Sequence, residues 1–305
     1  MRTTFIRTLI EVAAENDNVW LVAGDLGYSV LEAFSEKYPQ RYLNAGVAEQ
    51  NMTGIAAGLA LAGKTTFTYS IANFPVFRCL EQVRNDVCYH NLNVKVVAVG
   101  GGLAYGSAGY SHHAVEDLAV MRSLPNMVVF APADPVETQL VTRAAVQHQG
   151  PCYIRLGKAG EPVLHTATPA FAIGKGIVVR PEGDVAMIST GGMLGTVLRA
   201  ADELGQHGVK ARVISMPTVQ PIDRDLIERL ARETRAIVTV EEHGIGGLGS
   251  AVAEVLAECV ERPRFRAIRL DGAPSALAGT QDALRGAHGL SAPGIAAAVQ
   301  ALVAG

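Results

Sequence analysis

Three side chains stand at positions where this sequence could carry out chemistry. Glu49 begins a segment of small, apolar residues, Asp25 closely follows an apolar run at 19–23, and His112 ends a 13-residue, glycine-rich loop, GGGLAYGSAGYSH. The helix dipole stabilises a carboxylate at the start of a helix, so a simple helix-terminal charge is one interpretation of Glu49. A partly buried carboxylate also has a tuned proton affinity and can hydrogen-bond a heterocycle nitrogen. Glu49 is therefore the sharpest candidate for acid–base chemistry.

The elements that must position these residues alternate along the chain. Runs rich in Val and Ile, typical of buried parallel strands, are separated by segments with helical periodicity. The predicted strands are 19–23, 65–71, 94–99, 127–130, 153–156, 185–189, 211–214, 236–240 and 265–270. The predicted helices are 4–15, 48–62, 74–89, 115–123, 136–147, 194–206, 223–233 and 249–260. This pattern predicts an α/β protein with two doubly wound, mostly parallel sheets.

The same pattern divides the chain into two units. Between the two sets of elements the periodicity lapses in a stretch that contains two prolines and three glycines, which is typical of a linker. We therefore predict a first domain at 1–158, a linker at 159–176 and a second domain at 177–305. Ligands of open α/β sheets bind outside the carboxyl ends of the strands, so the residues that follow the first-domain strands should face one site.

Composition narrows the class of ligand. The 305 residues are 49% hydrophobic and 18% charged, with a net charge of -3, so no basic stripe favours nucleic acid and no charged face favours a membrane. No apolar run reaches the ~18 residues of a spanning helix, and the N-terminus lacks a signal-peptide core. The four cysteines have neither CxxC pairing nor a histidine at ligand spacing. We expect a cytoplasmic protein that binds a small molecule and ligates no metal itself.

The stretch NAGVAEQNMTGIAAGLALAG at 44–63 resembles the segment of transketolases and deoxyxylulose-phosphate synthases whose glutamate contacts the aminopyrimidine ring of thiamine diphosphate. Glu49 stands in that glutamate's place. The resemblance implies that Glu49 promotes the imino tautomer of the ring, whose nitrogen then deprotonates the thiazolium carbon. In such chemistry the cofactor carries the carbanion, and the protein supplies orientation and proton transfer.

Further matches follow in the family's order. The segment SIANFPVFRCLEQVRND places Phe74 and Phe77 where rings flank the pyrimidine, although both also fit a plain core stripe at helical spacing. The segment SHHAVE resembles the block whose histidine reaches the cofactor and a substrate oxygen, which assigns that role to His112. Its place in a long glycine-rich loop also favours a site. Asp25 corresponds to an acidic residue near the thiazolium.

Three residues resemble the family's contacts to a substrate phosphate. Arg155, in CYIRLGK, matches the phosphate arginine, and Arg2 and Ser29 fall at the spacing of two further contacts. Arginine suits this task because its planar fork meets phosphate bidentately. For both arginines, an ion pair at the edge of the domain is the alternative interpretation.

The sequence departs from the family's pattern at three positions. Ala108 replaces an aspartate that reads sugar hydroxyls, Gly100 replaces a phosphate-binding histidine, and Leu80 replaces a tyrosine. These three departures argue against the family's usual specificity for sugar phosphates. A different ketose, an aldehyde acceptor or a 2-oxoacid donor could fit such a site.

The resemblance covers the family's pyrimidine-binding and C-terminal domains but not the domain that holds the diphosphate and Mg2+. It implies one subunit of a split transketolase, which transfers a two-carbon ketol or related acyl-anion unit. A diphosphate-binding partner subunit would hold the Mg2+ of thiamine diphosphate, in a heterotetramer. The alternative within this chemistry is the beta subunit of a 2-oxoacid dehydrogenase's decarboxylase component, which has the same domain pair.

The segment Gly244–Gly249 suggests an alternative function of another class, dinucleotide binding. The segment GIGGLG follows a predicted strand and precedes a predicted helix, and Asp271 lies downstream, about the ~20 residues expected of a dinucleotide-binding fingerprint. In contrast, the surrounding VEEHGIGGLGSAV resembles the family's C-terminal domain, whose glycines make a tight turn without a nucleotide. A dinucleotide-binding protein is therefore the second alternative.

Overall fold

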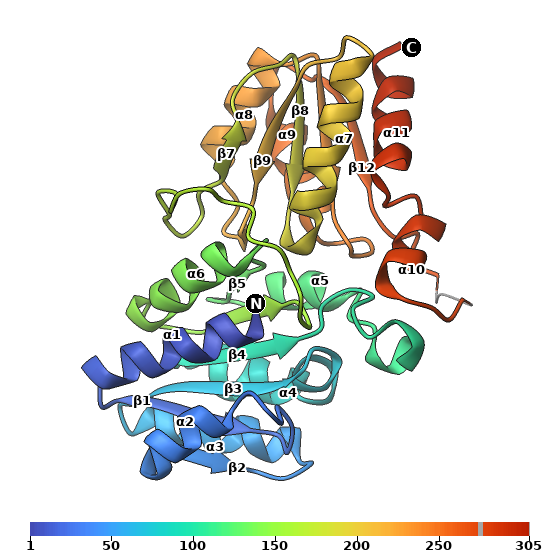
Figure 1. The fold of residues 1–305 in the computed structure, drawn as a ribbon. Coiled ribbons are helices and arrows are strands. Elements are labelled where there is room, and N and C mark those ends of the chain that lie inside the picture. Colours follow the sequence, from blue (N-terminus) through green and yellow to red (C-terminus); the bar gives the residue numbers. More distant parts are fainter. Residues whose placement is uncertain (274–276, 305) are drawn as a thin grey trace.

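The computed structural model describes residues 1–273 and 277–304. The first of its two sheets has seven strands in the order β10-β5-β6-β4-β3-β1-β2 (Figure 1). The strands are β1 (Val19–Ala23), β2 (Tyr42–Asn44), β3 (Thr65–Ile71), β4 (Val94–Val99), β5 (Val128–Phe130), β6 (Cys152–Leu156) and β10 (Thr218–Gln220). Neighbouring strands are parallel, except that β10 pairs antiparallel with β5. Every residue of β4 and β6 is buried, as expected for parallel strands covered on both faces.

Helices cover both faces of this sheet. They are α1 (Arg2–Glu15), α2 (Glu32–Lys37), α3 (Glu49–Leu61), α4 (Leu80–Gln82), α5 (Asp117–Arg122) and α6 (Pro135–Gln147). One apolar core lies under α1, α2 and α6, and another lies under α3, α5 and the segment around α4. Local sequence sets helix ends: Asp134 accepts a hydrogen bond from the backbone N–H of Glu137 at 2.8 Å, and a proline takes the first position of α6, both typical start signals.

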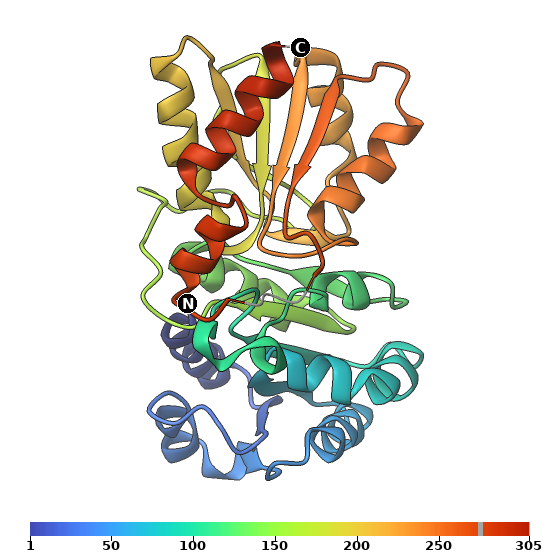
Figure 2. The same cartoon turned by 90° about the vertical axis from the view of Figure 1, so that its right-hand side faces the viewer.

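The second sheet has five strands in the order β12-β11-β8-β9-β7. They are β7 (Ile177–Arg180), β8 (Val185–Ser189), β9 (Ala211–Ser215), β11 (Ala236–Val240) and β12 (Arg264–Ile268). The helices are α7 (Leu194–Gln206), α8 (Arg224–Glu233), α9 (Leu248–Glu258), α10 (Gln281–Ala287) and α11 (Ala292–Ala304). The helices α7 and α11 lie on one face of this sheet, and α8 and α9 lie on the other (Figure 2).

One segment differs from the expectation that no part of the chain has the character of a membrane span. By length and composition alone, the helical segment Gln281–Ala304 is long and apolar enough to cross a membrane. Here it forms α10 and α11 with a break between them, and Leu284, Ile295 and Val299 belong to the core of the second domain. Core helices of globular domains commonly pass the same test.

The two sheets are mostly parallel, each with one antiparallel edge strand, and helices cover both of their faces, which confirms the predicted fold class. The nine predicted strands and eight predicted helical regions are all present within a few residues, except that 74–89 contains π-helical turns at Phe74–Arg78 and Val83–Cys88 around α4. The predictions missed β2, β7 and β10, which are short or at an edge, and the helices α2, α10 and α11. The predicted linker 159–176 lies between β6 of the first sheet and β7 of the second, but β10, farther along the chain, belongs to the first sheet.

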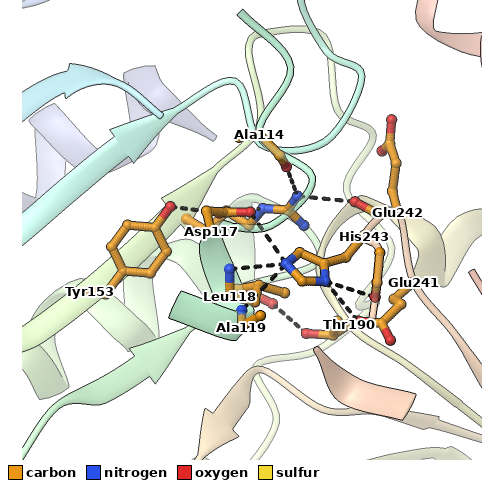
Figure 3. Close-up of polar contacts among 12 residues, drawn as sticks. Ala114, Asp117, Leu118, Ala119, Tyr153, Thr190, Glu241, Glu242 and His243 are labelled. Carbon is orange, nitrogen blue, oxygen red and sulfur yellow. Dashed lines mark hydrogen bonds and ion pairs between the residues drawn. The ribbon is translucent and has the colours of Figure 1, made fainter. Parts of the chain in front are cut away.

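Buried polar contacts join the two domains (Figure 3). His243 follows β11, and its Nε2 accepts hydrogen bonds from the backbone N–H groups of Leu118 and Ala119 at 3.1 and 3.4 Å, at the start of α5. Its Nδ1 lies 3.0 Å from the carbonyl of Gly244 and donates to it, because Nε2 already faces two donors. Burial lowers the pKa of His243 to about 4, although nearby Asp117 acts in the opposite direction. The imidazole is therefore neutral and serves as a cap.

This contact predicts a pH-dependent stability. The folded pKa of His243, about 4, is below its ordinary value of 6.5, so its contribution is present above pH 6.5 and is lost as the pH falls towards 4. The loss should reach on the order of 3 kcal/mol. Urea denaturation between pH 7.5 and 4.5 should show a shallower loss of unfolding free energy for His243→Gln than for the wild type. Identical pH profiles would contradict the capping role.

Candidate active site

The site is built on Glu49, the first residue of α3. Its side chain is almost wholly buried, with 4% of the residue exposed. Small residues let the helix approach the sheet: a Cβ built on Gly24, directly after β1, would lie 3.5 Å from Cγ of Glu49. The carboxylate thus lies at the carboxyl edge of the first sheet, where ligands of such sheets bind. This burial favours the functional interpretation over a solvated helix-terminal charge.

Arg78 is the cation that pairs with Glu49. Its Nη1 lies 2.9 Å from Oε1 of Glu49, and its guanidinium carbon lies 3.9 Å from the centroid of the Phe74 ring. Phe74 and Arg78 bound one π-helical turn, a distortion that is frequent at functional sites. Arg78 was missed in the sequence, although it stands four residues after Phe74, a spacing at which side chains meet on a helix.

Phe74 also contacts His112, which the loop after β4 brings back to the same edge. The two ring centroids are 5.5 Å apart in an edge-to-face arrangement, and the amide of Asn73 donates to the carbonyls of Tyr110 and Ser111 at 3.3 and 3.1 Å. The hydroxyl of Ser111 lies 3.0 Å from Nδ1 of His112, which leaves Nε2 for another partner. Glu49, Phe74 and His112 therefore form one continuous site.

Phe77 and Asp25 lie at the rim of this site. Phe77 is 43% exposed, in contrast to a core residue. Asp25 follows Gly24 with a φ of 54°, and its carboxylate accepts the amide of Asn44 at 2.9 Å and the hydroxyl of Tyr28 at 3.4 Å. These contacts hold the Asp25 carboxylate in place, one residue after the Gly24 that packs against Glu49.

Ser29 and Arg2 occupy neighbouring segments. Ser29 has a φ of 60°, and its backbone N–H donates to the Glu32 carboxylate at 2.8 Å. Arg2 begins α1 and is half-buried. Burial raises the pKa of Tyr105, and the Arg2 charge acts in the opposite direction. The structure does not test the predicted contacts of Ser29 and Arg2 with a substrate phosphate, so both stay predictions.

Arg155 lies in the domain interface, where it also lines a cavity together with Gly157 and Arg285. Its Nη2 donates to the carbonyls of Ala114 and Glu242 at 2.6 and 3.0 Å, and its Nε lies 3.0 Å from Oδ2 of Asp117. Both side chains of this ion pair are buried, and the Tyr153 hydroxyl donates to the same Asp117 oxygen at 2.6 Å. These contacts favour the alternative given above, an ion pair at the edge of the domain.

The glycine-rich segment Gly244–Gly249 does not leave room for a nucleotide diphosphate. The buried carboxylate of Glu241 accepts the backbone N–H groups of Leu248 and Gly249, each at 2.7 Å, at the start of α9. Burial raises the pKa of Glu241 to about 7, and the two amides act in the opposite direction. A Cβ on Gly247 would lie 2.1 Å from this carboxylate. The chain's own acid therefore occupies the anion site, which contradicts the dinucleotide alternative.

The site contains a buried carboxylate, an aromatic side chain and a histidine at the carboxyl edge of a mostly parallel sheet. This arrangement defines a class of protein that can present an acid–base group to a flat heterocycle. Comparisons with known proteins identify its family. The family model described as "Transketolase, pyrimidine binding domain" matches residues 1–160. The family model described as "Transketolase, C-terminal domain" matches residues 174–295. The chain belongs to the transketolase family.

The similar proteins include components of split transketolases. One component of the apulose-4-phosphate transketolase of Actinobacillus succinogenes is 35% identical, over 92% of this chain and 90% of that protein. A component of the 6-deoxy-6-sulfo-D-fructose transketolase of a Clostridium species is 38% identical, over 85% and 81%. A solved structure described as a split gene transketolase, inactive beta4 tetramer, is 40% identical with a TM-score of 0.90, and covers 99% of this chain and 97% of that one. This chain is thus one subunit of a split, transketolase-like enzyme.

The Arg155 contacts predict a stability effect. Arg155→Ala should lower the free energy of unfolding by about 3 kcal/mol, because removal of one partner leaves the buried Asp117 charge uncompensated. Urea denaturation measures this loss. The control is Arg224→Ala, which removes a 2.9 Å ion pair with Glu258 between exposed side chains and should cost at most about 1 kcal/mol. An unchanged stability with a raised KM for phosphorylated substrates alone would instead restore the phosphate-binding role.

Proposed function

We propose that this chain is the cofactor-activating subunit of a split transketolase, which binds the pyrimidine end of thiamine diphosphate. The observation that carries the proposal is the buried Glu49 carboxylate beside Phe74. Arg78 binds Oε1, and no other described residue donates a hydrogen bond to the Glu49 side chain. The second oxygen and the adjacent ring therefore suit a planar heterocycle that both stacks and donates a hydrogen bond, so the residues fit the pyrimidine ring.

When bound, thiamine diphosphate supplies a carbon nucleophile and an electron sink that allow a carbon–carbon bond beside a carbonyl to be broken and remade. Glu49 then exchanges a proton with the ring, and Arg78 fixes the orientation of its carboxylate. His112 presents Nε2 to a substrate oxygen because Ser111 engages Nδ1. Asp25 would lie beside the thiazolium, and Phe77 would complete the wall at the rim.

The diphosphate and Mg2+ belong to a partner subunit in this proposal. Among residues 1–273 and 277–304, no group of three His, Cys, Asp or Glu side chains could hold a metal ion, and a Mg2+ site requires several convergent oxygens. Two large apolar side chains near Asp25 and Glu49 in the sequence are exposed: Tyr28 is 72% exposed and Val47 is 73% exposed. A partner subunit at this site would cover them. We propose a heterotetramer of two copies of each subunit, located in the cytoplasm.

The proposed reaction is ketol transfer to an aldehyde in carbohydrate metabolism. The names of the relatives refer to sugars with a phosphate or a sulfonate group, which supports a ketose that carries an anionic group. The test is reconstitution with a diphosphate-binding transketolase subunit, followed by a screen of donors and acceptors. Thiamine diphosphate with Mg2+ should bind tightly only when both subunits are present. A lone chain that binds the cofactor and converts ketoses unaided would contradict the proposal.

Glu49→Gln should leave the assembly intact and lower turnover at least ~100-fold, because the amide keeps the shape but loses proton exchange. Steady-state kinetics of the reconstituted complex measure the loss, and size-exclusion chromatography verifies the assembly. The control is Glu36→Gln, which changes an exposed carboxylate of α2 and should leave turnover unchanged. Full activity in a pure Glu49→Gln complex would eliminate the assigned role.

A further inference from the structure

The loop that carries His112 needs anchors along its length. This segment, loop 100–112, follows β4 and has five glycines among its 13 residues. Glycine loses more conformational freedom on folding than any other residue, and fixing the backbone of one residue costs roughly 1–2 kcal/mol. The place of His112 at the end of the loop therefore depends on the contacts that hold the loop.

The carboxylate of Glu242 is the anchor at the start of the loop. Glu242 lies two residues after β11, in the second domain, and is 5% exposed. Its Oε1 accepts the backbone N–H of Leu103 at 2.9 Å. Gly102 has a φ of +67°, and a Cβ built on it would lie 2.6 Å from Cδ of Glu242. The glycine thus lets the backbone of the loop approach a carboxylate of the other domain.

The helix α10 holds this carboxylate from the other side. Nη2 of Arg285 donates to Oε2 of Glu242 at 2.6 Å, and the side-chain amide of Gln281 lies 3.0 Å from each carboxylate oxygen. A buried charge is stable only when such partners surround it. Glu242 therefore joins the start of the loop to α10.

The segment before α10 also supports the middle of the loop. Gly106 has a φ of +41°, and a Cβ built on it would lie 2.3 Å from the carbonyl oxygen of Gly279. The carbonyl of Gly106 accepts a hydrogen bond from Nε2 of the buried His113 at 2.9 Å. The second domain thus packs against loop 100–112 at two separate points.

We propose that Glu242 is a positioning residue for the reaction, and that its carboxylate sets the place of His112 through loop 100–112. This inference rests on the proposed function, because it requires His112 to meet a substrate oxygen. Without the anchor at Leu103, the glycine-rich loop shifts, and the His112 ring moves away from Phe74. The second domain thus affects turnover through the loop of the first domain.

The kinetic test uses the reconstituted complex. Glu242→Ala should lower kcat roughly 10-fold to 100-fold, because a displacement of ~1 Å in a reacting group can cost about 100-fold. The KM of the donor should stay within about twofold, as expected when an interaction made only in the transition state is lost. Glu242→Gln keeps an acceptor for the Leu103 amide and should recover part of kcat.

The matched control is Glu241→Ala, the same substitution at the adjacent buried residue. The Glu241 carboxylate accepts backbone N–H groups at the start of α9 instead of the loop (Figure 3). This variant should lower Tm but leave kcat unchanged. Equal losses of kcat in Glu241→Ala and Glu242→Ala would show general damage to the domain interface and would overturn the inference.

A double-mutant cycle with His112 separates positioning from damage elsewhere in the site. In a His112→Ala complex, Glu242→Ala should lower kcat by less than about twofold, because the group that it positions is already absent. The same fold loss in both backgrounds would mean that Glu242 does not act through His112.

Amide hydrogen exchange of the complex gives a readout that needs no turnover. Glu242→Ala should raise exchange about tenfold in peptides that cover 103–113, the scale of a lost hydrogen bond to a charged group, and should leave α3 unchanged. Glu242→Gln, which keeps the size of the side chain, allows the same comparison with a smaller effect if the alanine variant does not assemble. Unchanged exchange at 103–113 in the variant that assembles would overturn the anchor.

The outcomes separate the two levels of inference. A wild-type complex without ketol transfer would contradict the proposed function, while faster exchange of the loop in Glu242→Ala would still support the anchor. An active wild type whose kcat is unaffected by Glu242→Ala would overturn the positioning role alone.

Discussion

The buried contact of Arg155 with Asp117, Ala114 and Glu242 is the interaction on which the arrangement of this molecule depends. It joins a strand of the first sheet, the segment that follows the glycine-rich loop 100–112, and the second domain. The loop itself is closed by paired backbone bonds between Gly102 and Ala114. Because a buried charge is tolerated only with partners, the Arg155 guanidinium and the Asp117 carboxylate each depend on the other. The position of His112 therefore depends on contacts made by the second domain.

Much of the fold could be predicted because buried strands and helices leave strong periodic signals. The strands β1, β3 and β4 have the predicted bounds, since each begins directly after a polar residue and β1 and β4 end directly before a glycine. Short edge strands such as β10 carry no such signal. Their existence depends on a neighbour far away in the sequence, in this case β5, and local patterns do not contain that information.

Some residues of the site could likewise be predicted from the sequence, and others could not. Glu49 could be identified because a carboxylate within small apolar residues is unusual, and burial at the sheet edge agrees with that interpretation. Arg155 could not be interpreted from sequence: a guanidinium has the same signature whether it binds a substrate phosphate or a buried aspartate 38 positions away. The GxGxxG segment shows the same limit, because only the structure reveals that Glu241 takes the place of an external anion.

The crossing of β10 into the first sheet has a consequence for how the chain can be divided. Residues 1–158 carry Glu49, yet the strand that covers β5 comes from beyond residue 177. A fragment cut at the linker would expose the hydrogen-bonding edge of β5, and bare sheet edges promote aggregation. The two domains therefore share one sheet, and any engineered split between the two sheets would have to supply a replacement for β10.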